Sequence, residues 1–463
     1  MKRSVSLIFA VIISASSTFA QLQRSDAFHE KYKLSEAVIF SRHNIRAPLA
    51  TPGSFVSQVT PYQWYDFGVG RSELTMKGGI LETTNGQFFH QWVVSEGLFP
   101  ENAEPTDDEL YVLANSKQRT ISTARHFAAS FMPMKTVTVH HDGNIGDMDA
   151  TFSLNLNSDI TEAQWQQIKA EYDSAYSDQK IQQFCQSLKP TFDLLEDVLD
   201  VKNSEIYKAG TFTGFNNYNS TISYGVGTEP AMTASLNDAG DVVDALVLQY
   251  YQEPDLQKVA FGKTLTNEQW HDLAAIIHHR DAIRFSSPFV QRYVSKNLRH
   301  LIAAELQKEG RKFTFICGHD TNILNILSAL KVKSYETTDA IESGTPIGSK
   351  IVFEKWTDTA GNEYVGVNHV YQTVDQLRNN TLLNAATPPV IIPLSFDGLD
   401  PNADGLFPLS DIVSWLTGCD NPTDISNVKQ DATTGNVKEY TAEGIPSSKG
   451  YHGVKIQNGK KHI

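Results

Sequence analysis

Three segments of the chain share a pattern in which a short apolar run gives way to polar residues. They are AVIFSRHNIRAP at 37–48, LYVLANSKQRTISTARHFAASF at 110–131 and KFTFICGHDTNILNILSAL at 312–330. Such a run is typical of a buried strand, and the residues after it indicate a loop or the start of a helix. Because ligands of open α/β sheets gather at the carboxyl ends of strands, we expect these three ends to meet around one pocket.

Residues 155–300 differ from these three strand-like segments. Their apolar residues follow helical spacing over long stretches. We predict a mainly helical insertion there, interrupted at 208–233 by a loop or hairpin rich in Gly, Asn, Ser and Thr. Two strand-like segments, SKIVFEKWTD and EYVGVNHVYQT, and a last helix at 408–417 come later. The segment 421–463 is polar and poor in apolar residues, so we expect a flexible tail.

The first 20 residues carry the pattern of a secretory signal peptide. Lys2 and Arg3 precede an apolar run from Val5 to Ile13, and a stretch of small residues ends at Ala20. No later uncharged run reaches the roughly 18 residues that a transmembrane helix requires. We therefore expect a soluble protein that is periplasmic or secreted and has no membrane partner.

Composition and charge narrow the range of partners. The formal net charge of −14 disfavours nucleic acid, and an anionic ligand would have to be attracted by local charge. A chain of 463 residues is long enough for two or three domains. Three cysteines exclude a disulfide framework as the main source of stability. Cys317 has the surroundings of a core residue, whereas a bridge between Cys185 and Cys419 stays open.

The first candidate site lies at the end of the first predicted strand. Arg42 and Arg46 carry permanent, fork-shaped charges that suit a phosphate or carboxylate dianion. The same charges disfavour an imidazolium, so His43 between them is expected to be neutral and able to attack a phosphoryl group. The alternative is a partly exposed histidine in a basic loop.

The other two strand ends offer an acid and a further cation. His319 and Asp320 end the third strand, where Asp320 can either cap the next helix or protonate the leaving oxygen of a phosphate ester. The backbone amides of that helix start would favour an anion. Arg119 begins the helix after the second strand, either as an exposed first-turn residue or as a third guanidinium that stabilises charge during phosphoryl transfer.

The motif RHNIRAP, followed about 275 residues later by GHD, resembles the signature of the histidine acid phosphatases, R-H-G-x-R-x-P with a distant H-D pair. Further segments are similar to the glucose-1-phosphatase branch of that family, over approximately residues 34 to 417. They include ANSKQRT, VHHDGNIGDMDATF, VDALVLQYY and TPIGSKIVFEKW.

The resemblance implies a fold with two domains. Residues 21–154 and 301–420 would form an α/β core, with a central mostly parallel sheet flanked by helices. Residues 155–300 would form a mainly helical cap over the active site.

The resemblance also implies a two-step phosphoryl transfer. His43 would attack phosphorus to give a phosphohistidine, and Asp320 would protonate the leaving alcohol and then activate water. No cofactor or metal is required. The phosphate would be bound by Arg42, Arg46, Arg119 and His319.

The resemblance to the glucose-1-phosphatase branch singles out two more residues. Asn44 stands where most relatives have Gly and the glucose-1-phosphatase branch has Asn, so we predict that it narrows the pocket or orients a sugar hydroxyl. Glu229, in GTEPAM, resembles a gate on the substrate side that would accept a sugar hydroxyl and repel highly phosphorylated ligands. An exposed loop glutamate is the alternative.

The resemblance thus favours an exported acid phosphatase whose partners are a small sugar phosphate, such as glucose 1-phosphate, and water. A phytase or broad phosphomonoesterase on the same scaffold, and a binding protein that has lost catalysis, are the alternatives. DPNADGLFPLSD at 400–411 nearly fits a calcium loop, but Pro408 and the extended VIIPLSF before it favour a turn. The physiological substrate and the oligomeric state stay open.

Overall fold

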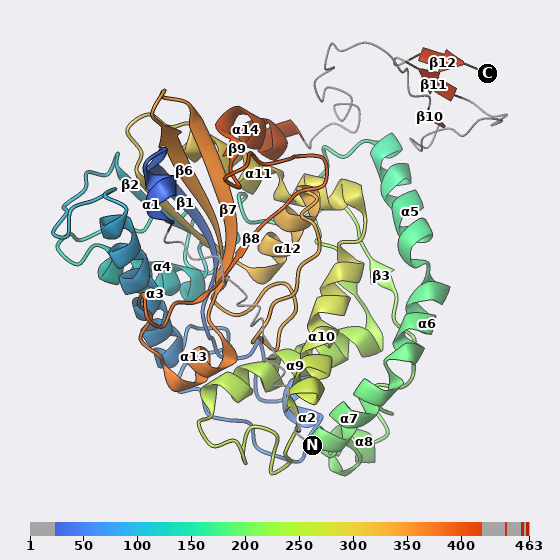
Figure 1. Cartoon of the computed structure of the whole chain (residues 1–463). Coiled ribbons are helices and arrows are strands. Elements are labelled where there is room, and N and C mark those ends of the chain that lie inside the picture. Colours follow the sequence, from blue (N-terminus) through green and yellow to red (C-terminus); the bar gives the residue numbers. More distant parts are fainter. Residues whose placement is uncertain (1–23, 419–439, 442–454, 458–459, 463) are drawn as a thin grey trace, which may run out of the picture. The chain divides into compact units, whose positions relative to one another are not determined.

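The computed structural model describes residues 24–418 and three short segments further along the chain (Figure 1). The described residues 24–418 belong to one compact unit, and the described segments beyond residue 420 belong to a second. In the second unit the strands β10 (Tyr440–Thr441), β11 (Lys455–Gln457) and β12 (Lys460–His462) pair antiparallel. The predicted signal peptide, Cys419 and most of the predicted flexible tail lie outside the described residues.

One mixed sheet carries the α/β part of the first unit. Its strands are β1 (Tyr32–Arg42), β2 (Leu110–Ala114), β5 (Phe313–Gly318), β6 (Lys350–Asp358), β7 (Glu363–Tyr371), β8 (Val390–Pro393) and β9 (Phe407–Pro408). They lie in the order β2-β5-β1-β6-β7-β8, and β9 pairs with β7. The neighbours β2, β5 and β1 are parallel, whereas the other pairs are antiparallel. The predicted α/β class is confirmed, with parallel pairing in the three strands that precede the candidate residues.

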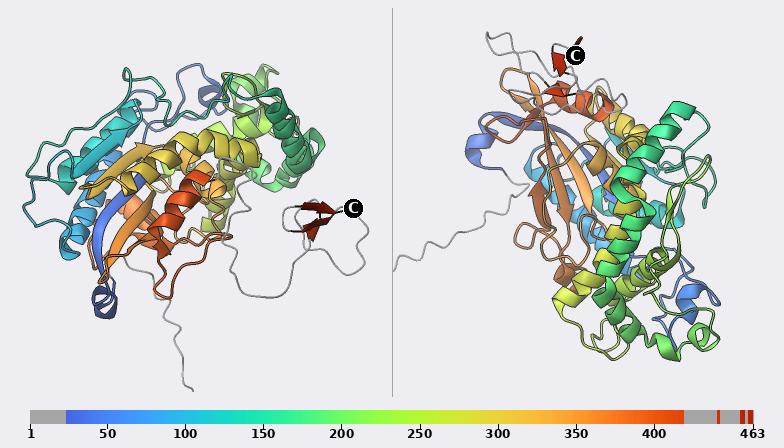
Figure 2. Two further views of the ribbon diagram at one scale, coloured as in Figure 1. Left: turned by 90° about the horizontal axis from the view of Figure 1, so that it is seen from above. Right: turned by 90° about the vertical axis from the view of Figure 1, so that its right-hand side faces the viewer.

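Helices cover both faces of this sheet (Figure 2). Along β1, Ala37 and Ile39 pack toward one face, while Val38 and Phe40 pack toward the other. A strand buried on both faces needs a continuous apolar run, which is the pattern in this segment. The first face is covered by α3 (Met76–Ser95) and α4 (Gln118–Phe131). The second face is covered by α11 (Pro288–Leu306), α12 (Asp320–Ala329) and α14 (Leu409–Gly418).

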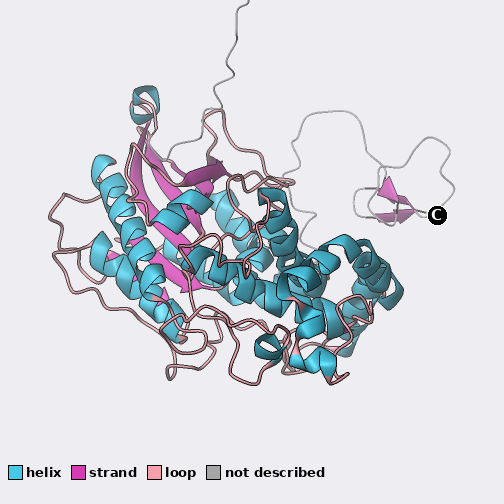
Figure 3. Cartoon of the chain, turned by 90° about the horizontal axis from the view of Figure 1, so that it is seen from below, coloured by secondary structure: helices cyan, strands magenta, loops and turns pink. Residues whose placement is uncertain are grey.

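The segment predicted as a helical insertion is mainly helical. Figure 3, coloured by secondary structure, shows the described chain with its helices and the strands of the sheet. The longer helices of the predicted insertion are α5 (Glu162–Tyr176), α6 (Asp178–Ser187), α7 (Lys189–Leu199), α9 (Ala234–Gln252) and α10 (Asn267–Arg284). The irregular stretch at 208–233 holds the small hairpin of β3 (Ile222–Ser223) and β4 (Ala231–Met232). The prediction that residues 155–300 form a separate domain stays a prediction. Helix α11 crosses the predicted boundary at residue 300.

Short helical segments complete the described chain. They are α1 (Asp26–His29), α2 (Phe55–Gln58), α8 (Glu205–Lys208), α13 (Val374–Asn379) and the 3₁₀ turn η1 (Val201–Asn203). Within the part of the chain that the structure describes, no helix has both the length and the apolar character needed to span a bilayer.

The packing of α3 on α4 depends on a glycine. A Cβ on Gly86 would lie 2.1 Å from Ser130 Oγ and 2.5 Å from the Phe127 carbonyl oxygen of α4. Alanine is favoured over glycine in a helix interior, but overpacking of this kind costs about 1–3 kcal/mol. We expect Gly86→Ala to lower the free energy of unfolding by about that amount in a urea titration. Gly79→Ala on the same helix is the control, because its Cβ would meet only the exposed ring of His126, which can turn away; equal losses for both variants would contradict this account.

Candidate active site

The three predicted strand ends meet at one edge of the sheet. Arg42 of β1 pairs with Gly318 of β5, and Ala114 of β2 pairs with Cys317. The backbone continues this registry, since the amide of His43 donates to the Gly318 carbonyl at 3.0 Å. The chain therefore leaves β1, β2 and β5 side by side, and the polar residues that follow these strands converge.

His43 is buried and held in one tautomer. Its Nδ1 lies 2.9 Å from the carbonyl oxygen of Asn44. Because a carbonyl can only accept, Nδ1 carries the proton and Nε2 keeps its lone pair. Burial lowers the pKa of His43 well below its usual value, and Arg119, Arg46 and the other nearby cations lower it further. The imidazole is thus neutral, and its Nε2 lone pair is available for nucleophilic attack; the role of nucleophile stays a prediction.

Arg42 is the last residue of β1, Arg46 lies in the loop that follows, and both are buried. Arg42 donates to the Thr345 carbonyl oxygen and pairs with Asp320 Oδ2 at 3.0 Å. Arg46 donates to its neighbour's carbonyl and pairs with Asp244 Oδ1 at 3.0 Å. Each arginine therefore has one carboxylate partner and further donors that an anion can use.

Arg119 adds a third guanidinium to the site, beside His319, whose pKa burial and Arg119 hold well below its usual value. Arg119, in the first turn of α4, has its NH2 group 3.3 Å from His319 Nδ1. The rings of His319 and His43 have centroids 5.5 Å apart. Burial, reinforced by Arg46, lowers the pKa of Arg119 to about 10, so it stays charged in acid and at neutral pH. Its buried Nε has no hydrogen-bond partner among the described residues, which suits an anionic ligand.

Asp320 is the first residue of α12 and is ionised in this state. Its Oδ1 accepts from the amide of the next residue, Thr321, at 2.8 Å, whereas the N-cap of the helix is His319. Burial raises the pKa of Asp320, but Arg42 and Arg46 outweigh this effect and hold the pKa well below its usual range. Asp320 is therefore not the cap of α12, one of the two roles weighed from the sequence; its carboxylate lies in the site beside Arg42, and its role as an acid stays a prediction.

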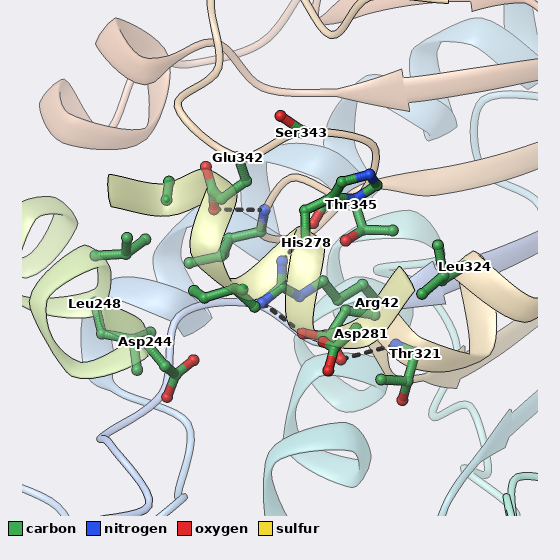
Figure 4. Close-up of a pocket in the computed structure, with 15 residues that line it drawn as sticks. Arg42, Asp244, Leu248, His278, Asp281, Thr321, Leu324, Glu342, Ser343 and Thr345 are labelled. Atoms are coloured by element: carbon green, nitrogen blue, oxygen red, sulfur yellow. Dashed lines mark hydrogen bonds and ion pairs between the residues drawn. The ribbon is translucent and has the colours of Figure 1, made fainter. Parts of the chain in front are cut away.

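A pocket lined by Arg42 and Asp320 adjoins the site, and Figure 4 shows Arg42 among its lining residues. Its polar lining includes four carboxylates. Among the described residues that line it, Arg42 is the only Lys or Arg. Burial lowers the pKa of His278, which adds no charge to the wall at neutral pH. The carboxylates are Asp244, Asp281, Asp320 and Glu342.

The two residues singled out for sugar recognition have other contacts in this state. Asn44 is fully buried. Its side-chain amide donates to Glu82 and accepts from the backbone amide of Ile45. Glu229 is half-exposed, pairs with Arg284 at 3.3 Å, and lies outside the residues that line the pocket. Their contact with a sugar hydroxyl stays a prediction.

The arrangement of a neutral imidazole, three guanidiniums and a carboxylate agrees with the family that the sequence resembles. The family model for the Histidine phosphatase superfamily (branch 2) matches residues 23–371. The chain belongs to this superfamily.

Relatives within the histidine phosphatase superfamily extend over most of the chain. A glucose-1-phosphatase of Salmonella typhimurium is 32% identical over 413 residues, which cover 88% of this chain and 97% of the relative. A glucose-1-phosphatase of Providencia rettgeri is also 32% identical, over 80% of this chain and 88% of the relative. The solved structure of the Hafnia alvei phytase has a TM-score of 0.75 and 28% identity, over 85% of this chain and 98% of that one. The histidine phosphatase fold and phosphoric monoester hydrolase class predicted from the sequence are confirmed.

Sequence motifs missed several residues of this histidine phosphatase site. Asp244 lies on α9, which also carries Asp238 and Asp241, so its one signal was its place inside the apolar run VVDALVLQYY. Asn115, whose Nδ2 is 2.7 Å from His319 Nε2, directly follows β2. Asp281 and Glu342 carry no local signal, because only tertiary packing brings them to the pocket.

Proposed function

We propose that this histidine phosphatase is an exported acid phosphatase that hydrolyses small sugar phosphomonoesters such as glucose 1-phosphate. One observation carries the chemistry: a buried, neutral His43 whose Nε2 is free lies among the charges of Arg42, Arg46 and Arg119. The glucose-1-phosphatase relatives support the substrate class. The signal-like pattern at 1–20 supports export.

In the first step the Nε2 lone pair of His43 attacks phosphorus. A P–N bond forms, and the P–O bond to the sugar breaks. The guanidiniums bind the non-bridging oxygens and stabilise the charge that they carry in the transition state. The sugar oxygen leaves with a proton from Asp320.

That proton has to arrive with the substrate, because Asp320 is ionised at rest. A phosphate monoester has a second pKa of about 6, so in acid it binds as a protonated monoanion. A phosphate oxygen that takes the place of Asp320 on Arg42 also weakens the ion pair that keeps Asp320 ionised. The phosphate proton can then pass through the Asp320 carboxyl to the leaving oxygen.

In the second step water attacks the phosphohistidine. Asp320, now ionised again, takes a proton from the water as an O–P bond forms. The P–N bond breaks, its electron pair returns to Nε2, and inorganic phosphate leaves. His43 regains the neutral state in which it began.

The lowered pKa of His43 suits this reaction to acid. As the pH falls below about 6.5, an ordinary histidine becomes protonated and loses its lone pair. His43 stays neutral to a lower pH, since its charged form is disfavoured by burial and by the arginines. The nucleophile is thus present in the pH range in which the substrate carries its own proton.

The pocket beside Asp320 supports a sugar rather than a polyphosphate as the leaving group. Carboxylates accept hydrogen bonds from hydroxyls, but they repel additional phosphates. Phytase activity is the second candidate, because the Hafnia alvei phytase shares the fold. The test is kcat/KM for glucose 1-phosphate against phytate at acid pH. We expect glucose 1-phosphate to be preferred, and a clear preference for phytate would contradict the substrate class.

A charge reversal in the pocket sharpens this test. Ser343 lines the pocket and is partly exposed, so a lysine there adds a cation without removing a described contact to His43 or the arginines. We expect Ser343→Lys to raise the ratio of phytate to glucose 1-phosphate turnover by about 5- to 30-fold, equivalent to about 1–2 kcal/mol. Ser343→Gln, similar in reach but neutral, controls for size. An equal change in both variants would mean that charge does not set the preference.

A further inference from the structure

A fully buried ion pair lies next to the loop that carries His43. Glu82 of α3 and Lys350, the first residue of β6, have their Oε1 and Nζ atoms 3.0 Å apart. Both side chains are almost completely buried. Burying two charges costs several kcal/mol, and such a pair is often no more stabilising than well-packed apolar residues. The pair therefore calls for a role besides stability.

Asn44 connects this pair to the nucleophile. Its Nδ2 donates to Glu82 Oε2 at 2.9 Å, and its Oδ1 accepts from the Ile45 amide at 2.9 Å. The backbone amide of Asn44 donates to Thr123 Oγ1 at 3.2 Å. The remaining polar atom of Asn44, its carbonyl oxygen, is the acceptor for His43 Nδ1. The residue that sets the tautomer of His43 is thus itself held by Glu82.

Glu82, Lys350 and Asn44 form one buried cluster, and Lys350 connects it to the loop that precedes β6. Its Nζ donates to the Gly348 carbonyl at 2.8 Å. Gly348 has a φ of +70°, and a Cβ there would lie 2.8 Å from Asn44 Nδ2, so the turn packs directly on the Asn44 amide. The following residue, Ser349, accepts from the Arg42 amide at 2.9 Å. The cluster therefore joins the backbone that carries Arg42 and His43 to the start of β6.

We propose that Glu82, paired with Lys350, is a positioning residue for His43. Through the Asn44 side chain it fixes the peptide whose carbonyl keeps the proton on Nδ1 and leaves Nε2 free to attack. Asn44 then acts in this chain as a support for the nucleophile. The inference rests on the proposed function, because it gives His43 the role of nucleophile.

The test combines kinetics with the nitrogen NMR signals of the His43 ring. We expect Glu82→Gln to lower kcat by about 10- to 100-fold, the usual cost of losing a support for a reactive group, while KM changes by less than about 3-fold. The fraction of His43 protonated on Nε2 should rise. Asn44→Ala should likewise lower kcat and raise the fraction of His43 protonated on Nε2. It replaces Glu82→Gln in the test if that variant does not fold. In the double variant the losses in kcat should not multiply, because both changes break one chain of contacts.

A matched control is offered by a second buried ion pair of β6. Glu36 of β1 is buried and pairs with Lys355 of β6 at 2.6 Å, and none of the hydrogen bonds described joins Glu36 to Asn44 or His43. Glu36→Gln should lower stability and leave kcat and the His43 tautomer unchanged. The proposal is overturned if Glu82→Gln behaves like Glu36→Gln, or if its loss in kcat multiplies fully with that of Asn44→Ala. Failure of the proposed function is separate, since it would appear as unchanged phosphate release in His43→Ala.

Discussion

Replacing His43 by alanine is expected to reduce kcat for glucose 1-phosphate by at least about 10⁴-fold, because removal of an enzyme's nucleophile abolishes the covalent route. The alanine leaves Arg42, Arg46 and Arg119 in place. Inorganic phosphate should therefore still bind, with a dissociation constant within about tenfold of that of the unaltered chain, measured by calorimetry. The chemistry would be lost while the anion site is kept.

This variant also separates an enzyme from a phosphate-ester binding protein. In a binding protein His43→Ala and the unaltered chain would release phosphate equally slowly. Loss of both phosphate binding and activity in a folded variant would instead make His43 a ligand of the anion. Either result would contradict its assignment as nucleophile.

Replacing Asp320 by asparagine is expected to slow hydrolysis in a way that depends on the leaving group. General acid catalysis contributes about 10²- to 10⁴-fold, and we expect a loss in this range for sugar phosphates, whose alkoxide leaves poorly without a proton. For p-nitrophenyl phosphate, whose leaving group is a stable anion, the loss in the phosphorylation step should be at least about tenfold smaller. Single-turnover measurements isolate that step from the later attack of water.

Asp244→Asn is the matched control for the acid. Asp244 also pairs with a site arginine at 3.0 Å, so this variant removes one carboxylate from beside Arg46 just as Asp320→Asn removes one from beside Arg42. A purely electrostatic effect on the arginines should appear in both variants and be independent of the leaving group. Equal losses for the two substrates in Asp320→Asn would contradict the role of Asp320 as acid.

The sequence predicted the parts of the fold that local pattern determines. β1, β2 and β5 are apolar because both of their faces are buried, and the helices α4 and α12 begin where polar residues replace that run. The strands β6 and β7 and the last helix were also expected. The antiparallel order of β6, β7 and β8 was not predicted, because pairing between distant strands is set by packing and leaves no period in the sequence.

The site also has residues that local pattern predicts and contacts that only tertiary packing sets. His43 and Asp320 stand directly after strands, where the parallel registry brings neighbours together, so their convergence could be predicted. Asn44 was expected to face the substrate, but its amide is taken by Glu82, a residue of α3 that nothing in the motif indicates. Glu229 has Arg284 as its described partner. Contacts of this kind depend on which helices pack behind the loop and are not encoded in its own residues.

The central claim is that phosphorus becomes bonded to His43 during turnover. The most direct measurement is to mix the enzyme with substrate carrying labelled phosphate, stop the reaction within milliseconds in alkali, which preserves phosphohistidine, and identify the labelled peptide by mass spectrometry. We expect the label on the peptide that contains RHNIRAP, at residue 43. Label on another residue, or turnover with no labelled peptide in a quench that recovers phosphohistidine from a known standard, would contradict the account.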